Sequence, residues 1–334
     1  MPKPKKILIL VAVGVQCAAL GAMCWQREAA LRSGAPVFMR TAPVDPRDLF
    51  RGDYVRLTYD VSAIPIDRVA EDEVEAMRRP EKRVYLSYQT DARNMVIPLK
   101  LSLKKPQQER FIRGYTQKDW RPDVVAVRYG VEKYFMQQGR GRDLERSRTL
   151  EGVRIPLEME VAVDRDNGIA VLKGYRYTEL GLGIVLPRRA SGQERPEFKV
   201  QVKLANASPQ PLRILDPEDH RSFRIELSSD WLPRNQEKIR FQQPSPPLEL
   251  YQASDVKIIP PRSLYQFEID LDQPRYQLVR GATSIDWDEM QSWETARIVY
   301  QTPDPALLSD LDDTWNLWQG RAVSRAFSGT NFRD

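Results

Sequence analysis

The most regular alternation of apolar and polar residues lies in residues 51–61, RGDYVRLTYDV. Val55, Leu57, Tyr59 and Val61 alternate there with arginine, threonine and aspartate. A period of two over this length predicts a β-strand with one buried and one solvated face. The same alternation predicts further strands at residues 82–90, 94–103 and 123–135.

Two local signals complete this first part of the chain. Acidic residues at 71–75 followed by Arg78, Arg79 and Pro80 predict a short helix, since acids favour the start of a helix and cations its end. Residues 154–177 predict two strands joined by the turn DRDNG. We therefore expect residues 36–187 to form one mainly antiparallel β domain.

The second part of the chain predicts another β domain. Residues 188–196 combine proline, glycine, serine and charges without an apolar period, which is typical of a linker. Residues 197–334 then show short alternating stretches with turn signals every 8–12 residues, as a β-sandwich does. The 25 prolines favour strands and loops over long helices.

The N-terminal segment differs from the rest. Lys3, Lys5 and Lys6 precede residues 7–25, where Gln16 is the sole polar side chain. About 20 apolar residues suffice to cross a bilayer, and preceding lysines predict a cytoplasmic N-terminus. We interpret residues 1–32 as a cytoplasmic tip and an uncleaved anchor; the alternative is a cleaved signal peptide.

Charge and composition narrow the function. Of the net charge of +5, residues 1–32 contribute +4, so the rest of the chain lacks the basic field that nucleic acid requires. Residues 100–148 hold thirteen Lys/Arg against six Asp/Glu, which suits either a solvated surface or a face turned to anionic lipid.

Both cysteines, Cys17 and Cys24, lie in the anchor. The single histidine, His220, is in a polar loop and is predicted to be solvated, so we expect no metal site, no cofactor and no Ser-His-Asp triad.

The strand at 51–61 carries a family resemblance. Gly52, Asp53, Tyr54, Leu57 and Tyr59 match the motif of the GDYXXLXYXI protein family, with Val61 in place of isoleucine. Residues 127–141, VRYGVEKYFMQQGRG, resemble a second block of that family, and the likeness covers about residues 1–180. It implies a bacterial membrane-anchored protein of unknown function that accompanies a multi-pass membrane protein.

A looser resemblance concerns residues 197–334. The segments VKLANASPQPLRIL, IIPPRSLYQFEIDL and WNLWQGRAVSRAF are similar to Ig-like sandwiches of bacterial extracytoplasmic proteins. This resemblance implies a module for binding or spacing, and it assigns no chemistry.

The motif itself has a structural and a functional interpretation. Gly52 permits a tight turn before the strand, and Asp53 can accept a hydrogen bond from the backbone two residues on. Leu57, Tyr59 and Val61 would then fill the core. In the functional interpretation, Asp53, Tyr54, Glu132 and Tyr134 line a groove that offers carboxylates and phenols to a polar ligand or partner.

One enzyme hypothesis remains as an alternative. The stretch RGDYV also resembles the strand near the active site of type I signal peptidases, with Ser33 as the nucleophile and Lys82 as a buried lysine base. The match is incomplete, because Gly34 stands where those enzymes have methionine and no later Gly-Asp-Asn-Arg segment follows.

The sequence therefore predicts a mainly β protein with an N-terminal transmembrane helix and two antiparallel β domains. It favours a non-catalytic binding or scaffolding role at the bacterial cell membrane, with the N-terminus inside and the bulk of the chain extracytoplasmic. The expected partners are the lipid bilayer and a multi-pass membrane protein, and not nucleic acid.

Overall fold

The fold consists of one long helix and a series of antiparallel sheets. The computed structural model describes residues 3–44, 54–119, 121, 123–135, 148–187, 198–229, 237–243, 250–308 and 315–333. Strands hold 45% of the residues and helices 20%, which confirms the predicted mainly β class. The chain divides into two compact units, the first made of residues 1–119, 124–141 and 158–176, the second of residues 120–123, 142–157 and 177–334.

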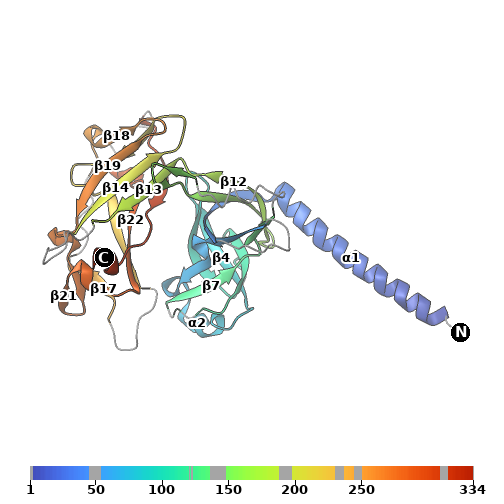
Figure 1. Cartoon of the computed structure of the whole chain (residues 1–334). Helices are drawn as coiled ribbons and strands as arrows, with labels where there is room; N and C mark the ends of the chain where they lie inside the picture. The colour runs from blue at the N-terminus through green and yellow to red at the C-terminus, as the bar shows by residue number, and fades with distance from the viewer. Residues whose placement is uncertain are drawn as a thin grey trace. The chain divides into compact units, whose positions relative to one another are not determined.

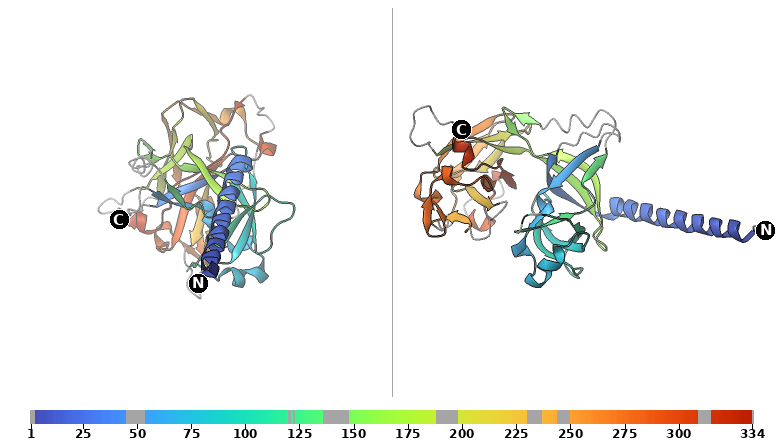
Figure 2. Two further views of the ribbon diagram at one scale, coloured as in Figure 1. Left: turned by 90° about the vertical axis from the view of Figure 1, so that its right-hand side faces the viewer. Right: turned by 60° about the horizontal axis from the view of Figure 1, so that its bottom comes forward.

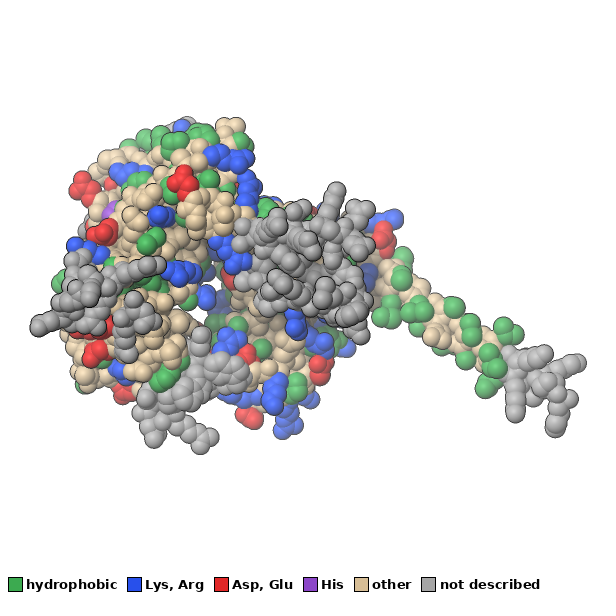
Figure 3. Space-filling model, viewed as in Figure 1, with side chains coloured by type: hydrophobic (Ala, Val, Ile, Leu, Met, Phe, Trp, Pro, Cys, Tyr) green, Lys and Arg blue, Asp and Glu red, His purple; other side chains and the backbone are tan. Residues whose placement is uncertain are grey.

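The first unit begins with the helix α1 (Lys3–Ser33), which the three views show as one uninterrupted rod (Figures 1 and 2). Within the described residues, its segment Leu8–Ser33 is the one helix long and apolar enough to cross a membrane, and none of its most apolar stretch is buried. Hydrophobic side chains line the visible face, and charged ones appear beside the β unit (Figure 3). The predicted apolar helix is confirmed.

Two five-stranded sheets form the body of the first unit. The first has the order β12-β11-β1-β2-β8 and the second the order β3-β7-β6-β4-β5. The strands of the first sheet are β1 (Ala35–Val44), β2 (Tyr54–Tyr59), β8 (Lys133–Phe135), β11 (Leu157–Val163) and β12 (Ala170–Tyr177). Those of the second are β3 (Ala63–Pro65), β4 (Arg83–Thr90), β5 (Val96–Ser102), β6 (Phe111–Thr116) and β7 (Val124–Arg128).

Most local predictions for this unit agree with the structure. The short helix is α2 (Glu71–Met77), with three acids in its first turn. The DRDNG turn joins β11 to β12, which are neighbours in the sheet. The motif strand is shorter than expected: β2 ends at Tyr59, and a 3₁₀ turn, η1 (Asp60–Ser62), replaces its last residues. The Ser62 hydroxyl accepts a hydrogen bond from the Tyr59 amide at 3.3 Å, which offers the backbone an alternative to the sheet.

A buried ion cluster ties several segments of the first unit together. Glu158 on β11 is fully buried, and its carboxylate accepts hydrogen bonds from Arg176 at 2.8 Å and from Arg93 at 3.2 Å. Arg40 on β1 lies 4.0 Å away. The Arg176 guanidinium also stacks over the Phe38 ring, 3.5 Å from its centre. A charge taken out of water needs such partners, so this cluster holds β1, β11, β12 and the turn after β4 in one arrangement.

The second unit contains several smaller sheets around one core. Its two main sheets have the orders β13-β14-β19 and β16-β22-β23, and smaller ones pair β15 with β18, β10 with β9, and β20 with both β17 and β21. The bounds are β9 (Thr149–Leu150), β10 (Val153–Arg154), β13 (Leu180–Val185), β14 (Lys199–Asn206), β15 (Leu212–Leu215), β16 (Phe223–Ser229), β17 (Ile239–Phe241), β18 (Val256–Ile259), β19 (Leu264–Asp270), β20 (Leu278–Arg280), β21 (Thr283–Ile285), β22 (Glu294–Gln301), β23 (Arg321–Val323) and α4 (Thr330–Arg333).

Both main sheets of this unit contribute to the same hydrophobic core. Alternate residues of β14, Val200, Val202 and Leu204, are fully buried, and so are Ile298 and Tyr300 of β22. Side chains at every second position can meet in this way only if the buried faces of the two sheets turn toward a common interior. The second unit is therefore a layered antiparallel β structure.

The predicted linker, residues 188–196, is not the place where the chain crosses from the first unit to the second. Residues 188–196 lie outside the described residues, but the strands on either side pair directly, with Leu182 of β13 opposite Leu204 of β14. The segment thus connects two neighbouring strands of the second unit. The last passage of the chain from the first unit to the second lies instead at residues 176–177, and earlier passages lie at 119–120, 123–124, 141–142 and 157–158. The difference arises because the apolar residues of β13 complete the core of the second unit, which its sequence position does not reveal.

We predict that Glu158→Ala lowers the stability of the first unit by about 3–5 kcal/mol, because it leaves buried guanidinium groups without their anion. Glu160→Ala on the same strand is the matched control. Glu160 is part-exposed and pairs with Lys173 at 3.2 Å, so its loss should cost at most about 1 kcal/mol. Hydrogen–deuterium exchange of β1 and β11 peptides during urea unfolding of the full chain measures both. Equal effects of the two substitutions would contradict the role given to the cluster.

Candidate functional site

The two sequence blocks that resemble the family lie side by side in the structure. The motif strand β2 pairs with β1 on one side and with β8 on the other. Its register against β8 places Val55 opposite Tyr134 and Arg56 opposite Lys133. The Leu57 amide extends this ladder by donating to the Glu132 carbonyl at 2.9 Å. Residues 54–57 and 132–135 therefore form one antiparallel ribbon.

This ribbon passes from one sheet of the first unit to the other. The segment with β2 and β3 leaves the first sheet for the second, and the segment with β7 and β8 makes the reverse passage. Because β2 pairs with β8 and β3 with β7, the two segments run together through the corner. Corners of this kind need a bend in the strands, and the 3₁₀ turn η1 provides it on one side.

Two tyrosines close the corner by a reciprocal exchange of hydrogen bonds. The Tyr59 hydroxyl donates to the Val131 carbonyl, and the Tyr129 hydroxyl donates to the Val61 carbonyl, both at 2.6 Å. The exposed fractions of Tyr59 and Tyr129 are 2% and 5%. Each tyrosine thus satisfies a carbonyl of the opposite segment that the bend removes from regular sheet pairing.

Glu132 stabilises the turn between β7 and β8. Its carboxylate accepts hydrogen bonds from the amides of Tyr129 and Gly130. Gly130 has a φ of +82°, a left-handed conformation that glycine adopts without strain. The carboxylate that the sequence suggested as a ligand for a partner is therefore engaged within the turn.

Burial makes both corner tyrosines poor acids. It raises the pKa of Tyr59 and that of Tyr129 far above the ordinary value, because a phenolate would lose its hydration. The negative charge of Glu132 raises the pKa of each further. Both hydroxyls are therefore protonated donors at neutral pH, which suits a structural role and opposes a role as general bases.

The other residues proposed for a groove are only partly brought together. Gly52 and Asp53 lie outside the described residues. The backbone register pairs Tyr54 with Phe135 and not with Tyr134, so positions 54 and 134 have opposite parity in the ribbon. The Tyr134 ring makes an edge-on contact with Tyr175 of β12, 6.0 Å between ring centres. Leu57 and Val61 are buried, as their structural interpretation predicts.

The residues of the hydrolase alternative have other environments. Ser33 is the last residue of α1, and its hydroxyl donates to the Ala29 carbonyl one turn earlier, at 2.8 Å. Lys82 is exposed just before β4, whereas the mechanism requires a buried lysine. We therefore give Ser33 and Lys82 no catalytic role.

One polar network in the second unit was not expected from the sequence. The His220 ring stacks on Phe267 with centres 4.1 Å apart, and its Nδ1 lies 2.8 Å from the buried carboxylate of Asp216. Asp216 also accepts a hydrogen bond from Tyr265 at 2.7 Å, and burial together with this aspartate raises the pKa of Tyr265. His220 is thus packed rather than solvated. The sequence signal that could have indicated this contact is the spacing of four residues between Asp216 and His220.

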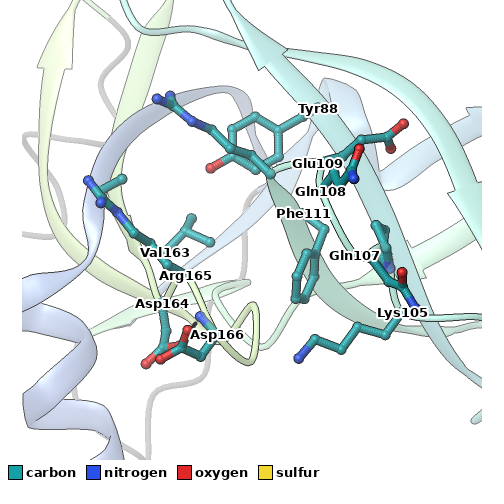
Figure 4. Close-up of a pocket in the computed structure, with 13 residues that line it drawn as sticks. Tyr88, Lys105, Gln107, Gln108, Glu109, Phe111, Val163, Asp164, Arg165 and Asp166 are labelled. Atoms are coloured by element: carbon teal, nitrogen blue, oxygen red, sulfur yellow. Dashed lines mark hydrogen bonds between the residues drawn. The ribbon is translucent and has the colours of Figure 1, made fainter.

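The described residues contain a cleft of about 370 Å³ in the first unit, between the β5–β6 and β11–β12 connections (Figure 4). None of the residues that the sequence suggested for a site lines it. Nor do the described parts of the chain contain a cluster of three or more His, Cys, Asp or Glu side chains fit for a metal ion.

We predict that Tyr59→Phe and Tyr129→Phe each destabilise the first unit by about 1–3 kcal/mol, because each leaves a buried carbonyl without a donor. Tyr134→Phe is the matched control, since its hydroxyl makes no hydrogen bond to a described residue and should change stability by less than about 0.5 kcal/mol. Urea unfolding of the full chain in detergent micelles tests this. A Tyr134→Phe effect as large as the others would refute the reciprocal exchange.

A second prediction concerns alkaline pH. Above about pH 10 the unfolded chain loses its tyrosine protons while the buried tyrosines keep theirs, so stability falls as pH rises. Each tyrosine with a raised pKa contributes a slope of about 1.4 kcal/mol per pH unit in this range. Tyr59→Phe should therefore lose less stability than the wild type between pH 8 and pH 11, as measured by urea unfolding at both values. An unchanged difference would show that Tyr59 does not resist ionisation.

The comparisons with known proteins agree with this geometry. No curated protein and no solved structure matches the chain. One family model does match, and it covers the second part of the apolar helix, the motif strand and its partner β8. Over residues 16–174 the chain matches the family described as GDYXXLXY protein, and the resemblance that its sequence predicted is confirmed.

Proposed function

We propose that this protein is a membrane-anchored extracytoplasmic binding or scaffolding protein that works beside an integral membrane partner. One observation carries the proposal, the apolar helical segment Leu8–Ser33 that continues directly into the first strand of a folded β unit. At about 1.5 Å per residue, its 26 residues extend about 39 Å, close to the thickness of a bilayer with its headgroups. Such a segment holds the β units at a membrane surface.

The proposed orientation follows from charge. Lys3, Lys5 and Lys6 precede the apolar segment, and positive residues beside a span favour the cytoplasmic side. The N-terminus would then be inside the cell and the two β units outside. The bacterial setting rests on the family resemblance.

The polar groups of the corner do not favour catalysis, so the proposal assigns binding to another part of the chain. The Tyr59 and Tyr129 hydroxyls and the Glu132 carboxylate all bond backbone groups of the corner, so they are committed to the fold. The second unit would act as the contact module. In this proposal it is an Ig-like sandwich, an architecture that many cell-surface proteins use for recognition, although fold alone does not assign a function.

Protease treatment of spheroplasts tests the anchor and its orientation. We expect external protease to remove residues 33–334 and to leave a short membrane-embedded fragment. A chain lacking residues 1–32 is the control and should be recovered outside the membrane fraction. Protection of the β units in intact spheroplasts, followed by digestion after lysis, would refute the extracytoplasmic orientation.

Site-directed photo-crosslinking in the same membranes tests the binding role. A photoreactive residue at Ile258 or Val185 samples exposed positions of the second unit, and we expect one of them to form a specific adduct with a multi-pass membrane protein. The same chain without the photoreactive residue is the control. If a scan of the exposed positions of both units forms no adduct, the scaffolding proposal fails while the anchor remains.

A further inference from the structure

The cleft of the first unit lies directly beside the end of the anchor. Ala35, two residues after α1, lines it together with Val163 at the end of β11. Ala30 is fully buried, and a Cβ added to Gly34 would stand 3.1 Å from the backbone of Val163. Glycine thus permits the helix end to pack closely against β11, and the cleft keeps a set distance from the anchor.

The length of the anchor places the cleft at the level of lipid headgroups. A segment of about 39 Å from Leu8 to Ser33 spans nearly all of a bilayer that measures about 40–45 Å with its headgroup layers. If Leu8 lies in one interface, Ala35 lies in the opposite one. A lipid headgroup can reach the cleft without leaving the membrane.

One side of the cleft is suited to a phosphate group. Arg110 and Arg165 line it, and neither guanidinium group makes a hydrogen bond or ion pair with a described residue. Tyr88 lines the same cleft, and its amide donates a hydrogen bond to the Arg110 carbonyl at 3.0 Å. Burial raises the pKa of Tyr88, and the charges of the two arginines oppose this effect. Tyr88 is 4% exposed, and its hydroxyl has no hydrogen-bond partner among the described side chains and backbone groups. Two guanidinium groups and a phenol offer several donors to phosphate oxygens.

The opposite side of the cleft carries two carboxylates. In Figure 4, Asp164 and Asp166 lie on the lower side of the view, whereas Glu109 lies on the upper side with the Tyr88 ring. Asp164 accepts hydrogen bonds from the amides of Asp166 and Asn167 in its own turn, both at 2.9 Å. Asp166 is exposed and has no ion pair within the described part of the chain. The Asp166 carboxylate is therefore available to a cation.

We propose that this cleft binds the headgroup of a zwitterionic aminophospholipid, with the phosphate at Arg110, Arg165 and Tyr88 and the ammonium at Asp166. The three carboxylates offset Lys105, Arg110 and Arg165, so the cleft does not select a ligand of net negative charge. Unpaired groups of both signs on opposite sides select a ligand that carries both. This inference rests on the proposed membrane anchor and adds a ligand to it.

Native mass spectrometry of the full chain in detergent micelles, with phosphatidylethanolamine, phosphatidylcholine and phosphatidylglycerol in equal amounts, tests the proposal. We expect phosphatidylethanolamine to be retained most, because its primary ammonium can donate hydrogen bonds to carboxylates and the trimethylated one cannot. The double variant Arg110→Gln, Arg165→Gln should retain on the order of fivefold less of it, as expected for two partly screened contacts. Arg56→Gln with Arg79→Gln, two exposed arginines outside the cleft, is the matched control and should bind normally.

A further substitution separates the two ends of the headgroup. Asp166→Asn should abolish the preference for phosphatidylethanolamine over phosphatidylcholine while lipid binding persists, whereas Glu109→Gln, on the Tyr88 side of the cleft, should keep that preference. Preferential retention of phosphatidylglycerol, or equal loss in the control arginine variant, would overturn the proposal. Saturable binding of free glycerophosphoethanolamine without any preference among the lipids would also overturn it, because the ligand would then be a soluble molecule and not a membrane lipid.

Carbonate extraction of the same chain from membranes distinguishes this inference from the anchor itself. An inserted chain without lipid preference refutes the headgroup site and leaves the anchor intact. A chain that is extracted like a peripheral protein refutes both, since the cleft would no longer be held at the headgroup layer.

Discussion

The first unit depends on the corner where its two sheets exchange strands. Two segments nearly seventy residues apart in the chain, around Tyr59 and Tyr129, turn there together. A bend in paired strands leaves carbonyl groups that the ladder no longer satisfies, and burying them without a donor is costly. The reciprocal tyrosine bonds remove that cost on both segments at once. The geometry of a turn between sheets thus explains the motif residue Tyr59.

Fixed partners for buried polar groups recur in both units. Glu158 is surrounded by arginines from three segments, and Asp216 holds His220 and Tyr265. Each of these clusters is specific, because a buried charge tolerates only an arrangement that supplies all its partners. Such clusters add specificity to cores that are otherwise held by apolar contacts. They also engage charged and titratable side chains in structural contacts.

The end of the apolar helix α1 packs closely against β11. A helix joined by a flexible linker would leave the β unit free to turn, but Gly34 brings the helix end against the backbone of Val163. Ala30 is buried at the same contact. The surface next to this contact, with its mixture of arginines and carboxylates, therefore has a defined position relative to the end of the apolar helix.

The sequence by itself determined the features that depend on local periodicity. The apolar anchor, the motif strand, the DRDNG hairpin and the short helix α2 each follow from spacing within about twenty residues. It also placed residues 127–135 with the motif as two blocks of one family. Only the tertiary structure decided what each buried face meets. The hydrogen bond of Tyr59 to the Val131 carbonyl and the contact of His220 with Phe267 join residues 72 and 47 positions apart. The membership of β13 in the second unit depends on the whole core of that unit. The periodicity of apolar residues predicts that a side chain is buried. Which segment packs against that side chain depends on long-range contacts, and these cannot be derived from the local pattern of a single sequence.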